Sequence, residues 1–174
     1  MDTSALAGAY RTLLDAAATV AGAGEPGPVP PPGEWDAEQI LAHVSVLTAT
    51  TLVTVATVAC GSGATYDNRP AQDGWTLGTV ITRAGGAPGL RERLRRQGEA
   101  LCLAAAVLGD AERAVRVPTL LVSHGTLLVD APMPLGDLLT GLADAELPGH
   151  AAQLLALLPP DSGTRPEPAA NATA

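Results

Sequence analysis

The sequence predicts a mainly α-helical domain: an up-and-down four-helix bundle with a small β-hairpin before its last helix. Four segments with apolar residues at helical spacing predict the helices, and one stretch of β-branched residues around a short turn predicts the hairpin. Aromatic residues make up only 2% of the 174-residue chain, so the core must consist of Ala, Leu and Val, which suit closely packed helices.

The first expected helix covers residues 3–20, where apolar residues recur on one face at helical spacing. Asp2 or Thr3 can cap its start. Residues 22–33 follow and are rich in proline and glycine, a composition that excludes a helix and predicts a stiff, extended connector.

The second expected helix has the clearest start signal in the chain. Asp36 is a favourable N-cap residue, and Gln39 three positions later completes the pattern of a capping box. Trp35, just before the cap, is placed to pack onto Ile40 as a hydrophobic staple. We expect this helix to continue to about Ala59.

The run from Ile40 to Cys60 carries no formal charge, and its length alone would suit a transmembrane helix. Five threonines lower its hydrophobicity, no basic residues flank it and no second span follows, so we interpret it as the central helix of the bundle. It also offers more apolar surface than one bundle face needs, which predicts a homodimer or larger assembly.

The second half of the chain alternates short and long elements. We expect a loop over residues 61–74, a short helix over 75–83, a longer helix over 88–108, a β-hairpin over 115–130 that turns at Ser123-His124-Gly125, and a last helical region over 134–158 interrupted at Pro148-Gly149. The longer helix is charged in its first half, which should be exposed. The proline-, glycine- and serine-rich composition of residues 159–174 predicts a disordered tail. We therefore expect residues 1–158 to form the one domain.

Composition limits the class of partner. The chain contains ten arginines, no lysine and 18 acidic residues, and its net charge of −8 argues against binding to nucleic acid or to anionic membranes. Cys60 and Cys102 form no disulfide framework and no CxxC pair, and the start of the chain lacks the pattern of a signal peptide. We therefore expect a cytoplasmic protein, and the arginine-rich, lysine-free composition is typical of a GC-rich bacterium.

The three histidines and one carboxylate are the main candidates for chemistry. His43 lies within the apolar second helix, where a lone histidine is usually structural. Glu146 and His150 are four residues apart, which places both side chains on one helix face. Such a pair can bind one divalent metal and leave coordination positions open, or it can be a solvent-exposed Glu–His pair.

Two phrases, GEWDAEQILAHVS and LGDLLTGLADAELPGHAAQLLALL, together resemble the DinB-like bundles, in particular the mycothiol-dependent maleylpyruvate isomerase type. The resemblance covers residues 4–158. It implies a four-helix bundle whose metal is held by one histidine from the second helix and by two ligands four residues apart from the last. Carried over, the ligands are His43, Glu146 and His150. Pro148 departs from the family pattern and predicts a kink between the last two ligands.

Other candidates lie in loops. His124 sits at the expected hairpin tip, where it is either a turn residue or, if the hairpin folds over the bundle mouth, a catalytic proton-transfer group. Tyr66, Arg69 and Trp75 lie in or beside the glycine-rich loop and are candidates for substrate binding. Arg69 could hold a substrate carboxylate or be a plain surface residue. Both cysteines are interpreted as packing residues.

We therefore expect a metal-dependent, thiol-using isomerase or S-transferase that acts on a small electrophilic metabolite. The expected cofactors are a divalent metal, most simply zinc, and, on the resemblance, mycothiol or another low-molecular-weight thiol. A bound metal lowers the pKa of a thiol and so supplies a thiolate nucleophile, or it polarises a carbonyl. The alternatives are a thiol-independent metal enzyme (a cyclase, lyase or hydrolase) and a non-catalytic binding protein of the same fold.

Overall fold

The computed structural model describes residues 1–23, 30 and 34–158. The expected connector over residues 22–33 therefore lies mostly outside the described residues, and the expected tail over residues 159–174 lies wholly outside them. The described chain is mainly helical with a small three-stranded sheet, which confirms the predicted fold class at that level.

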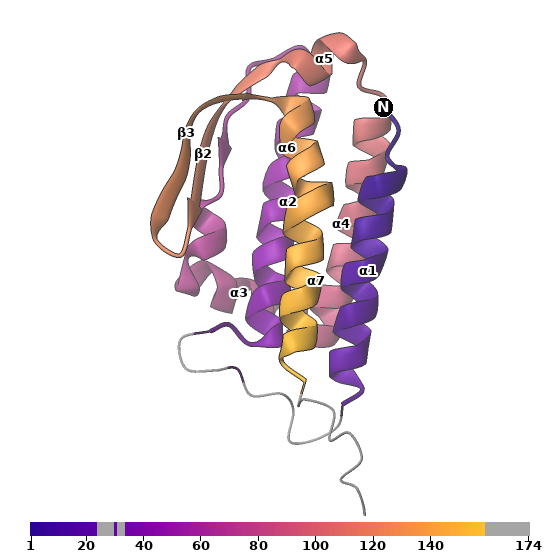
Figure 1. The fold of residues 1–174 in the computed structure, drawn as a ribbon, viewed down its shortest axis with the longest axis vertical. Coiled ribbons are helices and arrows are strands. Elements are labelled where there is room, and N and C mark those ends of the chain that lie inside the picture. Colours follow the sequence, from indigo (N-terminus) through magenta and orange to yellow (C-terminus); the bar gives the residue numbers. More distant parts are fainter. Residues whose placement is uncertain (24–29, 31–33, 159–174) are drawn as a thin grey trace, which may run out of the picture.

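Three long helices and one interrupted helical segment lie side by side along the length of the molecule (Figure 1). They are α1 (Ser4–Ala21), α2 (Ala37–Ala59), α4 (Gly86–Ala106) and the C-terminal rod, in which α6 (Leu135–Gly141), the π-helical turn η2 (Leu142–Glu146) and α7 (Leu147–Ala156) follow one another. Helix α1 packs against α4 and α7, and α2 packs against α4. Leucine, alanine and valine side chains from these helices dominate the core, as the composition predicts.

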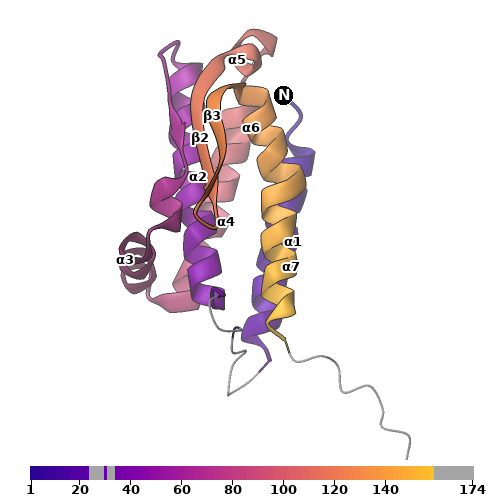
Figure 2. The same cartoon turned by 60° about the vertical axis from the view of Figure 1, so that its left-hand side comes forward.

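The helix directions differ from the predicted up-and-down alternation. The starts of α2 and α4 lie together, because the Glu38 Oε1 atom accepts a hydrogen bond of 2.9 Å from the backbone N–H of Ala87. Further along, Ser45 of α2 bonds to Gln97 of α4 at 2.9 Å, so the two helices run parallel. Residues 61–85 make this possible, since they carry the chain back along the molecule through the 3₁₀ turn η1 (Arg69–Gln72) and α3 (Gly74–Ala84) (Figure 2).

Helix α2 begins as predicted. The Asp36 carboxylate accepts a hydrogen bond of 2.8 Å from the Gln39 N–H, and the Gln39 side-chain oxygen accepts one of 3.0 Å from the Asp36 N–H. This reciprocal pair confirms the capping box. The Trp35 ring lies against the imidazole of His43, with 4.7 Å between the ring centroids, one helical turn beyond the predicted contact with Ile40.

Among the described helices, α2 is the one that is long and apolar enough to cross a membrane, judged by length and composition. Most of it is buried inside the protein, which is the position of a core helix. The apolar surface on which the expected homodimer was based is therefore largely covered by the chain itself. The oligomeric state stays a prediction, which light scattering at micromolar concentration checks.

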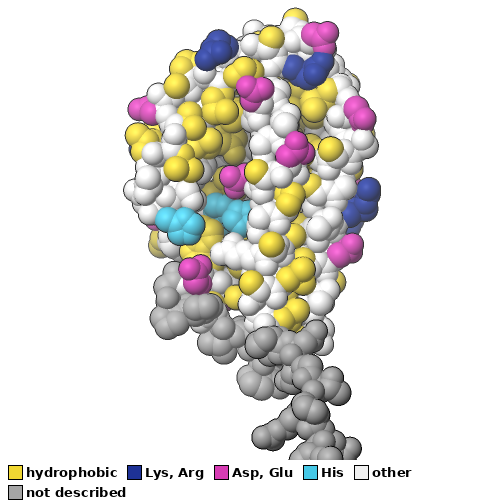
Figure 3. All heavy atoms as spheres, in the orientation of Figure 1, with side chains coloured by type: hydrophobic (Ala, Val, Ile, Leu, Met, Phe, Trp, Pro, Cys, Tyr) yellow, Lys and Arg dark blue, Asp and Glu magenta, His cyan; other side chains and the backbone are white. Residues whose placement is uncertain are grey.

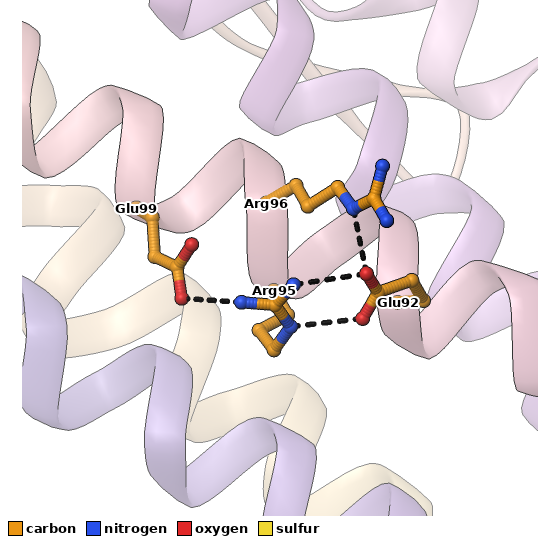
Figure 4. A network of polar contacts seen from close by, with 4 residues as sticks. All are labelled: Glu92, Arg95, Arg96 and Glu99. Atoms are coloured by element: carbon orange, nitrogen blue, oxygen red, sulfur yellow. Dashed lines mark hydrogen bonds and ion pairs between the residues drawn. The ribbon is translucent and has the colours of Figure 1, made fainter.

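Most charged side chains in the first half of α4 are exposed, as predicted, whereas Leu90 and Leu94 are buried in the core. Arg95 bridges Glu92 at 2.8 Å and Glu99 at 2.7 Å, and Arg96 also contacts Glu92, at 2.6 Å (Figure 4). All four side chains remain about half exposed or more, so solvent screens these ion pairs and they add little to stability. Both cysteines are free. Cys60 is exposed, so the prediction that it is a packing residue is wrong.

The hairpin consists of β2 (Arg116–Ser123) and β3 (Thr126–Pro134), preceded by the short α5 (Asp110–Ala114). Both residues of its turn have positive φ, 48° at His124 and 74° at Gly125, as tight hairpin turns require. The sequence did not indicate α5 or the two-residue strand β1 (Tyr66–Asp67), which pairs in parallel with β2. The register of the hairpin shifts at Leu121/Val122, a β-bulge that leaves Leu128 as the extra residue of β3.

Candidate metal centre

Three side chains from separate elements meet on one face of the molecule. His43 comes from α2, Glu146 ends the π-helical turn and His150 lies in α7. One ligand atom from each residue lies within 4.8 Å of the other two, so the three could hold one metal ion. Figure 3 shows histidine and acidic side chains together in a hollow of this face, between the hairpin and the C-terminal rod.

A hydrogen bond to the backbone outside the cluster positions the His43 ring. Its Nδ1 atom lies 2.7 Å from the carbonyl oxygen of Ala71 in η1. Because a carbonyl can only accept, Nδ1 carries the proton and the Nε2 lone pair is free for a ligand. Burial lowers the pKa of His43 to about 4, so the ring is neutral at physiological pH and needs to lose no proton before it binds a metal.

His150 is also held by a hydrogen-bond acceptor outside the cluster. Its Nδ1 atom lies 3.0 Å from the side-chain oxygen of Gln153, while its Nε2 atom lies 3.6 Å from the Glu146 carboxylate. The Nε2–H and the positive charge that His150 has when protonated hold the pKa of Glu146 below its ordinary value, so the carboxylate is ionised at neutral pH. In both histidines an acceptor outside the cluster fixes the tautomer, as partners of metal-binding histidines do.

The chemistry of this donor set fits a divalent cation. With both Nδ1 atoms protonated, two imidazole lone pairs and one carboxylate face the same point, and no hydrogen-bond donor lies between them. These groups repel one another unless a cation or an added proton stands between them. Two neutral nitrogens and one carboxylate form a ligand set that suits zinc and leaves a coordination position open.

The structure corrects the expected kink at Pro148. The helix continues through this proline, and the irregularity lies just before it, in the π-helical turn. Pro148 is in the first turn of α7, where its missing N–H is tolerated, and the residue four positions earlier, Asp144, lies inside the wider turn. Glu146 and His150 therefore keep their one-turn spacing. Single π-helical turns of this kind are frequent at functional sites.

The cluster opens into a cavity of about 360 Å³, here called the metal-centre cavity. Its lining consists of Glu34, Trp35, His43, Asn68, Gln72, Leu121, Val122, Ser123, His124, Leu128, Glu146, His150 and Gln153. The hairpin tip forms one wall, so the hairpin folds over the cluster. The bulge contributes to this wall, since the extra residue Leu128 is one of the lining side chains.

Of the other predicted site residues, the structure places some beside the cluster and others away from it. His124 lines the metal-centre cavity, and its Nδ1 atom lies 3.0 Å from the Ser123 hydroxyl. Tyr66 is buried and lines a neighbouring cavity. Arg69 and Trp75 line neither: the Arg69 guanidinium is bound to the Asp67 carboxylate, and Trp75 is 79% exposed on α3. The structure therefore does not bring these two to the expected substrate.

Sequence reasoning missed the residues that shape the cavity around the cluster. Trp35 covers the His43 ring, and Gln153 orients His150. Asn68 ties the loop to the hairpin, because its amide donates to the Val122 carbonyl at 2.9 Å and accepts from the Val122 N–H at 2.8 Å. The Trp before the capping box was a usable signal, whereas nothing in the sequence around Asn68 indicates a partner 54 residues away.

Replacing Asn68 by alanine should loosen the hairpin. The change removes two hydrogen bonds to Val122 at a buried position, and we expect the free energy of unfolding to fall by about 2–3 kcal/mol. Urea denaturation measures this. Gln72→Ala is the matched control, because Gln72 makes one longer bond of 3.3 Å to the same carbonyl and its loss should change stability by less than about 1 kcal/mol. Equal losses in the two variants would contradict the role of Asn68.

Comparison with known proteins identifies no relative: no family model, no curated protein and no solved structure matches the chain.

Proposed function

We propose that the protein is a metal-dependent enzyme of the DinB-like four-helix type, which uses a small thiol to isomerise or S-conjugate a small electrophilic metabolite. The observation that carries the proposal is the convergence of His43, Glu146 and His150 beside a cavity large enough for a small substrate. The ligands come from the second and the last of the long helical segments, which is the placement that the family resemblance implies.

The residues around the cluster have separate tasks in this proposal. When bound, a zinc ion supplies a thiol of lowered pKa or a polarised carbonyl. Trp35 packs against the His43 ring, with 4.7 Å between the ring centroids, and Gln153 holds His150 in the tautomer that ligates. His124, on the hairpin wall, is placed to give a proton to the reacting molecule or to take one from it.

The experiment compares zinc-loaded protein with and without mycothiol, using the fluorogenic electrophile monochlorobimane as the probe. We expect conjugation to be faster than the uncatalysed reaction, and expect chelation or the Glu146→Gln change to remove the difference. Trp75→Ala is the control, since this exposed side chain lies away from both cavities and its loss should leave the rate unchanged. Metal-loaded protein that never exceeds the uncatalysed rate with mycothiol, cysteine or glutathione would contradict thiol use.

A thiol-independent lyase, cyclase or hydrolase is the second candidate. It is favoured by the exposed His124 at the cavity wall, because such enzymes commonly use a histidine for proton transfer. Metal-dependent turnover that is unaffected by thiols would select it. A non-catalytic binding protein would show no metal and a melting temperature that chelators do not change. Cytoplasmic location and a bacterial source remain predictions.

A further inference from the structure

Beside the metal-centre cavity lies a second, smaller one of about 130 Å³, here called the side cavity. The two cavities share Asn68, Leu121 and Glu146 as lining residues, so they meet at the candidate metal ligand. Figure 3 shows the same face hollowed along the gap between the hairpin and the C-terminal rod, with hydrophobic side chains bordering it. We propose that the substrate site continues past Glu146 into this side cavity, which takes a small apolar group of an uncharged or cationic ligand.

Apolar side chains form the larger part of the side-cavity lining, and polar groups, two carboxylates among them, form the rest. Leu47 comes from α2, Met133 from β3, and Leu138 and Leu142 from the C-terminal rod. The volume is about four times that of one water molecule in the liquid, which is enough for a small apolar group such as a short alkyl chain. Each methylene that enters such a space should raise affinity about fourfold.

Charge decides which ligands can enter. Three carboxylates line the two cavities, Glu34, Asp137 and Glu146, and none of the described lining residues is an arginine. Even with a metal held by Glu146, the described lining of the side cavity contains the carboxylate of Asp137 and no arginine, so a carboxylate on the non-reacting end of a ligand is repelled there. The inference rests on the proposed function for the reacting end of the substrate, and it specifies the non-reacting end as neutral or positively charged.

Gly141 is the position from which we expect a larger side chain to fill the side cavity. It lines the cavity, and a Cβ atom added at this position would meet nothing within 4 Å. Its backbone is helical, with φ −57° and ψ −40°, so any L-residue fits without strain. A leucine at position 141 should therefore fill the space while it slightly favours the helix.

The test uses metal-free protein in the presence of a chelator, with propyl-, butyl-, pentyl- and hexylammonium ions as probes. The ammonium group can pair with Glu146 while the alkyl chain enters the side cavity. NMR titration should show an affinity that rises about fourfold per added methylene, with shifts at Leu138 and Leu142. Butyrate to hexanoate should bind at least about tenfold more weakly than the amines of equal length.

Gly141→Leu should remove the dependence on chain length. Gly78→Leu is the matched control, because Gly78 is also a helical glycine with open space and lies on α3, away from the side cavity. Affinity that does not change with chain length, or a Gly141→Leu variant that keeps the wild-type dependence, would overturn the inference. Since no metal is present, either result is independent of whether the three ligands bind a metal, which metal titration of the same protein tests separately.

Discussion

Replacing His150 by alanine is expected to weaken zinc binding by at least about 100-fold, because the change removes one of three protein ligands. Loss of an outer partner of a ligand alone commonly lowers metal affinity 10–100-fold, and loss of the ligand should exceed this. The His150 ring lies 4.7 Å from the His43 ring and its Nε2 atom 3.6 Å from the Glu146 carboxylate, and among the described residues no fourth His, Cys, Asp or Glu belongs to this cluster. Competition titration against a chromogenic chelator measures the affinity.

Two controls separate ligation from other effects of losing a histidine. Gln153→Ala removes only the acceptor of the His150 Nδ1 proton, and we expect a loss of about tenfold. His124→Ala removes the hairpin histidine, which belongs to the cavity wall but not to the cluster, and should leave zinc affinity unchanged. Equal affinities of wild-type and His150→Ala protein would contradict the assignment of the ligands.

Metal-free protein is expected to lose stability as the pH falls from 7 to 4.5. Burial lowers the pKa of His43 from 6.5 to about 4, so between these values the unfolded chain binds a proton that the folded protein does not. The unfolded state is therefore favoured as the pH falls through this window, and the stability is fully present above the unfolded pKa. The expected loss by pH 4.5 is about 2.5 kcal/mol.

Urea denaturation at a series of pH values checks this expectation. The measurement stops at pH 4.5 because the pKa of Glu146 is lowered, which adds a further loss of the same sign at lower pH. In His43→Gln the slope across the window should become shallow, whereas His124→Gln, which changes an exposed histidine, should keep the wild-type slope. A wild-type stability that is flat or rises on acidification would contradict a buried, neutral His43.

Most helices could be predicted from local sequence because their signals are local. Asp36 and Gln39 fix the start of α2 through a capping box, and Gly85 ends α3 in the left-handed conformation that glycine tolerates. The hairpin follows from its β-branched residues and from the His124-Gly125 turn. The directions of the helices could not be predicted from local sequence. The parallel packing of α2 and α4 depends on how far residues 61–85 carry the chain back along the molecule.

The candidate site was predictable only where spacing on one element decides it. Glu146 and His150 share a helix face by their spacing, and His43 stands out in an apolar helix. Asn68 was missed, because its contacts come from chain segments far apart in sequence. Arg69 was expected in the site and lies outside it, since its nearest acid, Asp67, two residues earlier, binds the guanidinium on the surface.

The most direct test of the metal centre is anomalous X-ray diffraction at the zinc edge from crystals of the zinc-loaded protein. Three ligand atoms within 4.8 Å of one another should close around one ion. We expect one anomalous peak per chain, about 2.0–2.2 Å from the Nε2 atoms of His43 and His150 and from a carboxylate oxygen of Glu146. A fully loaded protein with no peak between these three residues, or with its peak at other residues, would contradict the assignment.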